Sequence, residues 1–163
     1  MLVRILTYIS IFLVVLACSK DEKIYVASEK VDPYILYEEG FEAFKKNNFF
    51  LANKKFSKAE LNFENIEYAS KSAIMSIFSL YGINFYNQAL DELTRFKKTY
   101  PVDKNIIYAH YLEAIIYYEQ ISDEKKDLDP LLNAQKKIDF FLNKYQNSDY
   151  AIDLKFKKDL IRN

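Results

Sequence analysis

The hydrophobic positions between residues 33 and 63 follow the spacing of two short amphipathic helices. Apolar side chains occupy helical spacings, at Leu36, Phe41, Ala43, Phe44, Phe49, Ala52, Phe56, Ala59 and Phe63. This is the pattern of helices with one buried face. Asp32 followed by Pro33 is a typical helix start, which predicts a first helix up to about Lys46. Asn47 and Asn48 then predict a turn, and a second helix follows to about residue 63.

A glycine in the middle of the first helix indicates that the two helices cross closely. Gly40 lies where glycine costs about 1 kcal/mol relative to alanine. We expect a compensating contact in which Ala52 and Ala59 of the second helix face the glycine.

The spacing of the second helix recurs twice along the chain. Ala52 is followed at offsets of 4, 7 and 11 residues by Phe56, Ala59 and Phe63. The same offsets after Ala89 and Ala134 hold Leu93, Phe96, Tyr100, Ile138, Phe141 and Tyr145. The anchoring alanines are 37 and 45 residues apart, close to the period of about 34 residues in tetratricopeptide repeats. The chain is therefore predicted to contain an internal repeat of helix pairs.

The repeat resembles the tetratricopeptide motif. Its small and aromatic signature positions match Gly40, Ala52, Phe56 and Ala59, and Pro101 matches the proline that ends a repeat. The motif is broken at Ile77, Ala114 and Gln146. The resemblance implies an all-α solenoid of antiparallel helix pairs, with about three repeats over residues 33–147 and the first helix of a fourth over 148–163.

The remaining helices are predicted at 66–82, 86–99, 106–120 and 129–144, with a charged connection over 121–129. Asp103 or Asn105 is expected to cap the helix at 106–120. Asp129 followed by Pro130 is the expected start of the helix that ends at 144. Residues 148–163 either cap the solenoid or show that the sequence is a fragment of a longer protein.

Composition supports helices and makes nucleic acid an unfavourable partner. The chain has 163 residues, of which 50% are hydrophobic, with only 2 glycines and 3 prolines. Basic and acidic residues balance at 23 each. A chain without a net positive field or an arginine-rich face is not expected to bind nucleic acid.

The first 17 residues have the form of a signal peptide for export. Arg4 precedes an apolar run that ends at Cys18. The alternative is a membrane anchor helix, but the run is shorter than the roughly 20 residues that span a bilayer and no basic flank follows it.

Val15-Leu16-Ala17-Cys18 resembles the bacterial lipobox, in which the cysteine is lipidated and becomes the new N-terminus. The alternative is a chance cysteine in an apolar stretch. Cys18 is the only cysteine of the chain, so it cannot form an intramolecular disulfide. We expect a covalent lipid on Cys18, a tether over 18–32 and no other cofactor. Ser19 resembles the residue that follows the cysteine in lipoproteins sorted to the outer membrane.

Tetratricopeptide geometry places one face of each first helix on a concave groove. The corresponding positions are Tyr34, Tyr37, Phe41, Phe44, Lys71, Ile74, Phe78, Tyr81, Tyr108, Tyr111, Ile115 and Tyr118. Tyrosine suits surfaces that are apolar on one side and hydrated on the other. A peptide groove is therefore predicted at Tyr34, Tyr37, Phe41, Phe78, Tyr81, Tyr108, Tyr111 and Tyr118. The alternative is that these rings are simply core.

The sequence gives little support for catalysis or a metal site. His110 is the only histidine and has no cysteine or second histidine to complete a ligand set, so a structural role is favoured. Carboxylates alternate with lysines at helical spacing, which predicts a solvated face that includes Glu38, Glu39, Glu42, Glu60 and Glu64. The acidic run 123–129 is interrupted by lysines and is predicted to be an exposed loop rather than a cation site. A cell-wall hydrolase is a weak alternative, with Glu113 or Glu119 as the carboxylate.

The lipobox, the tether and the order of the repeats together resemble the BamD family of outer-membrane lipoproteins, which belong to the β-barrel assembly machinery. The segments that carry the resemblance are 34–56, 84–101 and 107–121. The resemblance implies a non-enzymatic protein, lipid-anchored at the periplasmic face of the outer membrane. Its implied partners are BamA, other lipoproteins of the complex and unfolded outer-membrane proteins with an aromatic-ended segment. In that family the BamA contact lies largely C-terminal to the residues present here. The alternative is a periplasmic tetratricopeptide lipoprotein that organises cell-wall enzymes.

Overall fold

The computed structural model describes residues 31–121 and 128–162, which lie in one compact unit. Every regular element in these residues is a helix, and the prediction of an all-α fold is confirmed. The helices are α2 (Pro33–Lys45), α3 (Phe49–Asn62), α4 (Ile66–Gly82), α5 (Tyr86–Thr99), α6 (Ile106–Glu119), α7 (Asp129–Lys144) and α8 (Tyr150–Arg162). The expected signal peptide, Cys18 and most of the tether lie outside the described residues, as does most of the 121–129 connection.

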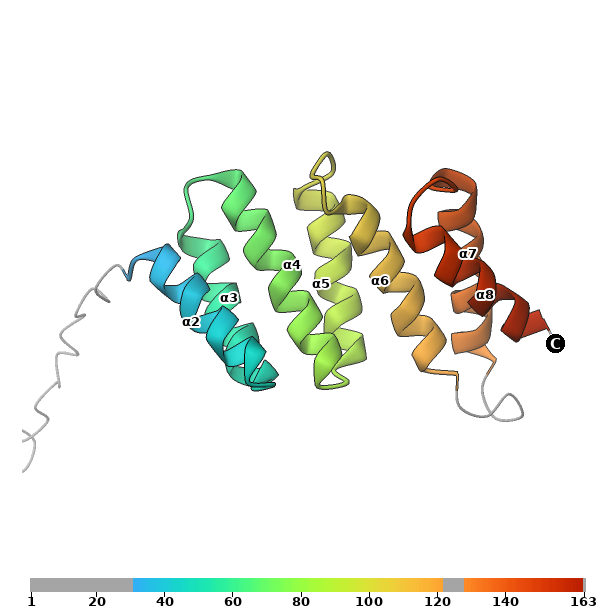
Figure 1. Cartoon of the computed structure of the whole chain (residues 1–163), viewed down its shortest axis with the longest axis horizontal. Helices are drawn as coiled ribbons and strands as arrows, with labels where there is room; N and C mark the ends of the chain where they lie inside the picture. The colour runs from blue at the N-terminus through green and yellow to red at the C-terminus, as the bar shows by residue number, and fades with distance from the viewer. Residues whose placement is uncertain (1–30, 122–127, 163) are drawn as a thin grey trace, which may run out of the picture. The chain divides into compact units, whose positions relative to one another are not determined.

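The helices form two layers of antiparallel neighbours. In Figure 1, α2, α4, α6 and α8 lie nearer the viewer, and α3, α5 and α7 lie behind them. Each helix packs against the next one along the chain, and α6 also contacts α8. Among the described residues, no helix is long and apolar enough to cross a membrane.

Two asparagines make the turns inside the first two helix pairs. Asn47, with φ 57°, and Asn84, with φ 60°, adopt the left-handed conformation that asparagine tolerates well. The side chain of Asn48 then accepts a hydrogen bond from the Leu51 amide and caps α3. The predicted turn at Asn47 and Asn48 is confirmed.

The observed caps of α6 and α7 differ from the predicted ones. Helix α7 begins at Asp129 itself, and the N-cap is Leu128 without a capping side chain. The Asp129 carboxylate therefore lies in the first turn, where the helix dipole favours a negative charge. Asn105 is the N-cap of α6 but its side chain does not cap it. Asp103 instead accepts hydrogen bonds from the Asn105 amide (2.8 Å) and the Ser70 hydroxyl (2.6 Å), which fixes the α5–α6 connection to α4.

The repeated small and apolar positions form the core. The residues at the anchor and at offsets 4 and 7 are fully buried in each second helix: Ala52, Phe56, Ala59, Ala89, Leu93, Phe96, Ala134, Ile138 and Phe141. All of them except Ala59 and Ala134 belong to three clusters, between α2 and α3, among α4, α5 and α6, and among α6, α7 and α8. Helix α6 is apolar on all sides because it packs against α5, α7 and α8.

The close approach predicted at Gly40 is present, but its partner is different. A Cβ atom on Gly40 would lie 2.9 Å from the Phe56 ring, and its nearest neighbours are all atoms of that ring. The ring of Phe56, rather than Ala52 and Ala59, fills the space that glycine leaves. Gly82 accommodates the Phe49 ring in the same way, with a nearest distance of 3.0 Å.

Candidate functional site

A row of aromatic rings runs along the layer formed by α2, α4, α6 and α8. This aromatic ladder consists of Phe44, Phe78, Tyr81, Tyr108, Tyr111 and Tyr150. Ring centroids are 5.6 Å apart for Phe44 and Phe78, and 6.4 Å apart for Phe78 and Tyr108. Tyr150 lies 5.6 Å from Tyr108 and stacks on Tyr111 at 4.6 Å. Rings from four helices thus form one connected series.

Helical spacing places these rings on one face. Phe78 and Tyr81 are three residues apart on α4, as are Tyr108 and Tyr111 on α6, so each pair occupies one side of its helix. The rings of the ladder within α2, α4 and α6 are half-buried, which leaves part of each accessible.

Three tyrosine hydroxyls of the ladder, those of Tyr81, Tyr108 and Tyr111, remain protonated at neutral pH. Burial raises the pKa of Tyr108 and Tyr111 well above the ordinary range, and the hydrogen bond from Tyr111 to Asp153 (3.0 Å) adds to the rise at Tyr111. Burial also raises the pKa of Tyr81, with a smaller contribution from the charge of Glu119. The ladder therefore offers apolar rings and neutral hydroxyl groups together.

The structure brings together four of the eight predicted groove residues. Phe78, Tyr81, Tyr108 and Tyr111 belong to the ladder. The other four, Tyr34, Tyr37, Phe41 and Tyr118, make their ring contacts elsewhere.

Each of those four has a different neighbour. Tyr34 packs edge-on against Phe63 and Tyr68 at 5.0 and 5.2 Å. Tyr37 packs on the core ring of Phe56, with the Lys71 ammonium 5.2 Å from its centroid. Phe41 is exposed, and lysine ammonium groups lie over its ring and over that of Tyr118.

The prediction omitted two residues of the ladder. Phe44 was among the twelve groove positions but was not selected. Tyr150 begins α8, in the range predicted as the first helix of a fourth repeat. The groove positions were assigned only for the first three repeats, so Tyr150 was not considered.

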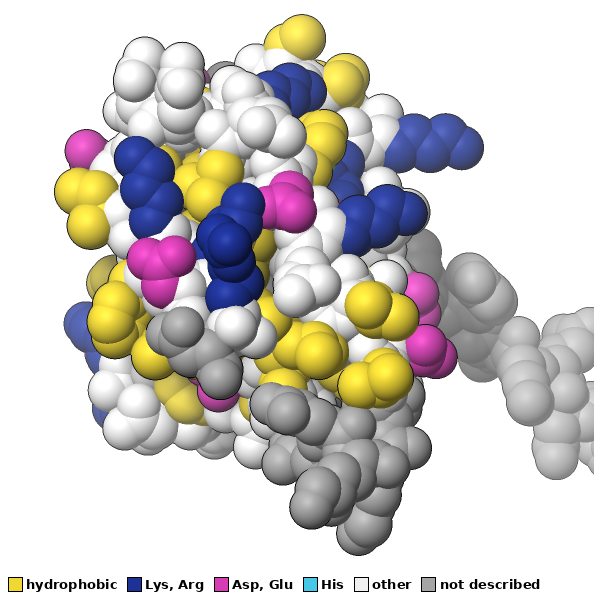
Figure 2. Space-filling model, turned by 90° about the vertical axis from the view of Figure 1, so that its right-hand side faces the viewer, with side chains coloured by type: hydrophobic (Ala, Val, Ile, Leu, Met, Phe, Trp, Pro, Cys, Tyr) yellow, Lys and Arg dark blue, Asp and Glu magenta, His cyan; other side chains and the backbone are white. Residues whose placement is uncertain are grey.

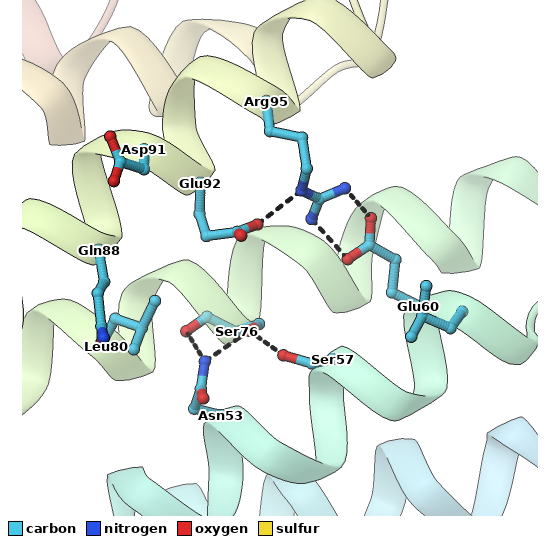
Figure 3. A pocket seen from close by; sticks show the side chains of 10 residues that line it. Asn53, Ser57, Glu60, Ser76, Leu80, Gln88, Asp91, Glu92 and Arg95 are labelled. Atoms are coloured by element: carbon cyan, nitrogen blue, oxygen red, sulfur yellow. Dashed lines mark hydrogen bonds and ion pairs between the residues drawn. The ribbon is translucent and has the colours of Figure 1, made fainter.

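The prediction that Glu60 lies on a solvated face is wrong, because the side chain is buried. Its side chain is only 8% exposed, and both carboxylate oxygens accept hydrogen bonds from Arg95 at 2.8 Å. The Tyr100 hydroxyl donates a third bond at 2.9 Å. Figure 3 shows the paired Glu60 and Arg95 side chains reaching across from α3 and α5. Glu60 was placed at the surface because its lysine neighbours suggested local pairs, whereas its partner lies 35 residues away.

Glu113 forms a second buried ionic cluster. Its oxygens accept bonds from Lys97 on α5 (2.6 Å) and Lys137 on α7 (2.9 Å), and Nδ1 of His110 lies 3.9 Å away. Burial raises the pKa of Glu113, but the nearby His110 and the hydrogen bonds from Lys137 and Lys97 outweigh it and hold the pKa at about 2. The carboxylate therefore ties three helices together.

His110 packs among aromatic rings. Its ring centroid lies 5.0 Å from that of Phe140 and 5.6 Å from that of Tyr145. In the part of the chain that the structure describes, no group of three or more His, Cys, Asp and Glu side chains could hold a metal ion. Glu119, the other carboxylate considered for hydrolysis, is exposed on the last turn of α6.

Comparison with known proteins gives a consistent set of similarities. Residues 29–163 match the family YfiO, described as outer membrane lipoprotein. The chain is 31% identical over 126 residues to a protein of Rickettsia prowazekii (strain Madrid E), an alignment that covers 77% of this chain and 50% of that protein. It is 29% identical over 142 residues to one of Caulobacter vibrioides, covering 87% of this chain and 47% of that protein. It is 25% identical over 128 residues to a protein of Neisseria meningitidis serogroup B, and that alignment covers 72% of this chain and 48% of that protein.

These three relatives are all named outer membrane protein assembly factor BamD. The chain spans about half the length of each of them. Their names do not favour the alternative of a scaffold for cell-wall enzymes.

Proposed function

The chain belongs to the YfiO family of outer membrane lipoproteins, which includes proteins named BamD, and from this premise we propose that it takes part in assembling outer membrane proteins. The observation that carries the proposal is the aromatic ladder, which gives one layer of the repeat a continuous surface for a peptide. The role is one of binding rather than catalysis.

The ladder supports recognition of an extended, aromatic-ended segment of an unfolded outer membrane protein. Side chains of such a segment stack on the accessible edges of Tyr81, Tyr108 and Tyr111, while the tyrosine hydroxyls bond its backbone or terminal carboxylate. Aromatic pairs contribute about 0.5–1.5 kcal/mol each beyond their burial. A few such contacts give modest affinity, which suits a protein that passes its client on.

The proposal extends to an assembly complex, because the relatives are named as assembly factors. In this view the chain works beside BamA and other lipoproteins of the machinery.

The peptide site is tested by binding of a labelled ten-residue peptide from the C-terminal strand of an outer membrane protein, ending in phenylalanine. Tyr81→Ala is expected to weaken binding three- to tenfold, because one ring of the ladder is lost. Fluorescence anisotropy of the peptide on the full chain in detergent measures it, and thermal unfolding checks that the variant is folded.

Phe140→Ala on α7 is the matched control, because this ring is 42% exposed and lies outside the ladder. It is expected to change binding less than twofold. A peptide ending in alanine should bind more weakly than the phenylalanine peptide. Equal loss of binding in Tyr81→Ala and Phe140→Ala, or no loss in either, would contradict the role of the ladder.

The location is tested at Cys18. We propose that a lipid on this cysteine holds the protein at the periplasmic face of the outer membrane, which the signal-like residues 1–17 and the lipobox-like residues 15–18 support. Cells grown with a labelled fatty acid are expected to label the chain, and Cys18→Ala to abolish the label and release the protein from the outer membrane fraction. Retention of the label in Cys18→Ala would refute this anchor.

A further inference from the structure

A cavity of about 520 Å³ opens between α3 and α5, over α4, and it is separate from the aromatic ladder. We call it the α3–α5 cavity; it is lined by Asn53, Ser57 and Leu61 of α3, Ser76 and Leu80 of α4, and a row of polar side chains of α5. Figure 3 shows these side chains converging from the three helices.

The cavity and the ladder lie on opposite sides of α4. Ser76 and Leu80 line the cavity, whereas Phe78 belongs to the ladder. Positions two apart in a helix are separated by about 200° around the axis, since each residue turns by about 100°. A molecule in the cavity therefore leaves the ladder free.

Small side chains at the floor create the cavity. Ser76 is 5% exposed, and its hydroxyl is bonded to the Asn53 amide nitrogen and to the Ser57 hydroxyl, both at 2.8 Å. The Asn53 amide nitrogen also donates to the Ser76 carbonyl at 3.2 Å. These polar groups satisfy one another, and the small side chains leave the space between α3 and α5 open.

The rim is acidic and keeps unused hydrogen-bonding groups. Three carboxylates, Glu60, Asp91 and Glu92, line the cavity against one guanidinium, Arg95, which both glutamates hold in ion pairs. Asp91 and Gln88 have no hydrogen-bond or ion-pair partner among the described residues. In Figure 3 these two lie toward the end of the cavity away from the Glu60–Arg95 pair.

Apolar surface also lines the cavity. Leu61, at the rim, is 83% exposed, and Leu80 forms part of the wall. A long side chain with an aliphatic stem and a cationic end matches this combination, because the stem covers apolar surface while the charge reaches the carboxylates.

We propose that the α3–α5 cavity binds an extended segment of a partner protein through a lysine or arginine side chain. The cationic end lies at Asp91 and Glu92, and the stem packs against Leu80. The amide group of Gln88 bonds the backbone of the segment. The chain carries no net charge, so the attraction comes from this local group of carboxylates rather than from a field of the whole protein.

The test uses fluorescein-labelled hexapeptides of serine and leucine with one central lysine, arginine, glutamine or glutamate. Binding to the full chain in detergent is followed by anisotropy at low salt. The lysine and arginine peptides are expected to bind at least fivefold more tightly than the glutamine peptide, and the glutamate peptide most weakly. Asp91→Asn is expected to weaken the lysine peptide three- to tenfold without affecting the glutamine peptide.

Asp159→Asn is the matched control, since Asp159 is an exposed aspartate on α8, far along the chain from the cavity. It should leave every affinity within twofold, as should Tyr81→Ala in the ladder. Equal binding of the lysine and glutamine peptides would overturn the proposal, and so would unchanged binding in Asp91→Asn. Weaker lysine-peptide binding in Tyr81→Ala but not in Asp91→Asn would assign the peptide to the ladder and also overturn it. Because Asp91 and Tyr81 lie on different surfaces, failure here leaves the proposed function untouched.

Discussion

At the scale of single residues, two buried carboxylates connect neighbouring helices through ion pairs, in addition to the hydrophobic contacts between those helices. Glu60 joins α3 to α5 through Arg95, and Glu113 joins α6 to α5 and α7 through Lys97 and Lys137. Buried ion pairs contribute little net stability relative to apolar packing, but removing one partner is costly because a buried charge is left uncompensated. Losing the partner of either carboxylate is therefore expected to destabilise the packing of the helices that it connects.

Glu113 gives the protein a predictable dependence on acid. Its pKa is about 2 in the folded protein against a usual 4.5, so its contribution to stability is complete above about pH 4.5 and is lost as the pH falls toward 2. The shift corresponds to about 3 kcal/mol at most. We expect the free energy of unfolding to fall over this range, and Glu113→Gln to be less stable at pH 7 with a flatter pH profile. Urea unfolding at a series of pH values measures both.

Glu39→Gln is the matched control for this prediction. Glu39 pairs with Lys55, but its side chain is 49% exposed, so solvent screens the pair. The variant should change the free energy of unfolding by less than about 1 kcal/mol and keep the wild-type pH profile. A Glu113→Gln profile parallel to that of the wild type would show that Glu113 does not cause the acid dependence.

At the scale of helices, the sequence predicts the elements well because each second helix repeats the same small and apolar register. The predicted bounds of the helices from 66 to 82 and 86 to 99 are those of α4 and α5, and the helix predicted to end at residue 144 ends there as α7. The ends of the other helices differ from the prediction by one or two residues. These differences are small because turn residues such as Asn47 and Pro101 mark the breaks in the sequence. Periodicity thus carries most of the local structure.

Contacts between helices distant in sequence could not be predicted in this way. Glu60 has lysines nearby in sequence, and nothing in that pattern indicates that Arg95 approaches it in space. The α3–α5 cavity was missed for the same reason, although the serines at 72, 76 and 79 show that α4 has unusually small polar side chains. In the ladder, periodicity identified which rings share a helix face but not which rings of different helices meet.

At the scale of the whole described unit, the helices stack in a row and the core is divided along that row. The cluster of Ala43, Ala52 and Phe56 lies between α2 and α3, whereas that of Ile138, Phe141 and Leu154 belongs to the α6–α8 end. Figure 2 looks onto the α7 and α8 end, where hydrophobic side chains lie between basic ones. Helix α8 exposes the side chains of Ile152, Phe156 and Leu160. In repeat proteins, stability is close to a sum of units and neighbouring interfaces.

This division predicts that core mutations at the two ends act locally. Phe56 and Phe141 are both fully buried phenylalanines of the second helices of their pairs, and either change to alanine is expected to cost about 3–5 kcal/mol. Phe56→Ala should speed amide hydrogen exchange mainly in α2 and α3, and Phe141→Ala mainly in α7 and α8, because exchange follows the opening of local cooperative units. Hydrogen exchange followed by mass spectrometry resolves the segments, and each variant serves as the control for the other. If both variants speed exchange equally across all the helices, the unit opens as a single cooperative body, and the separation of the core clusters has no energetic counterpart.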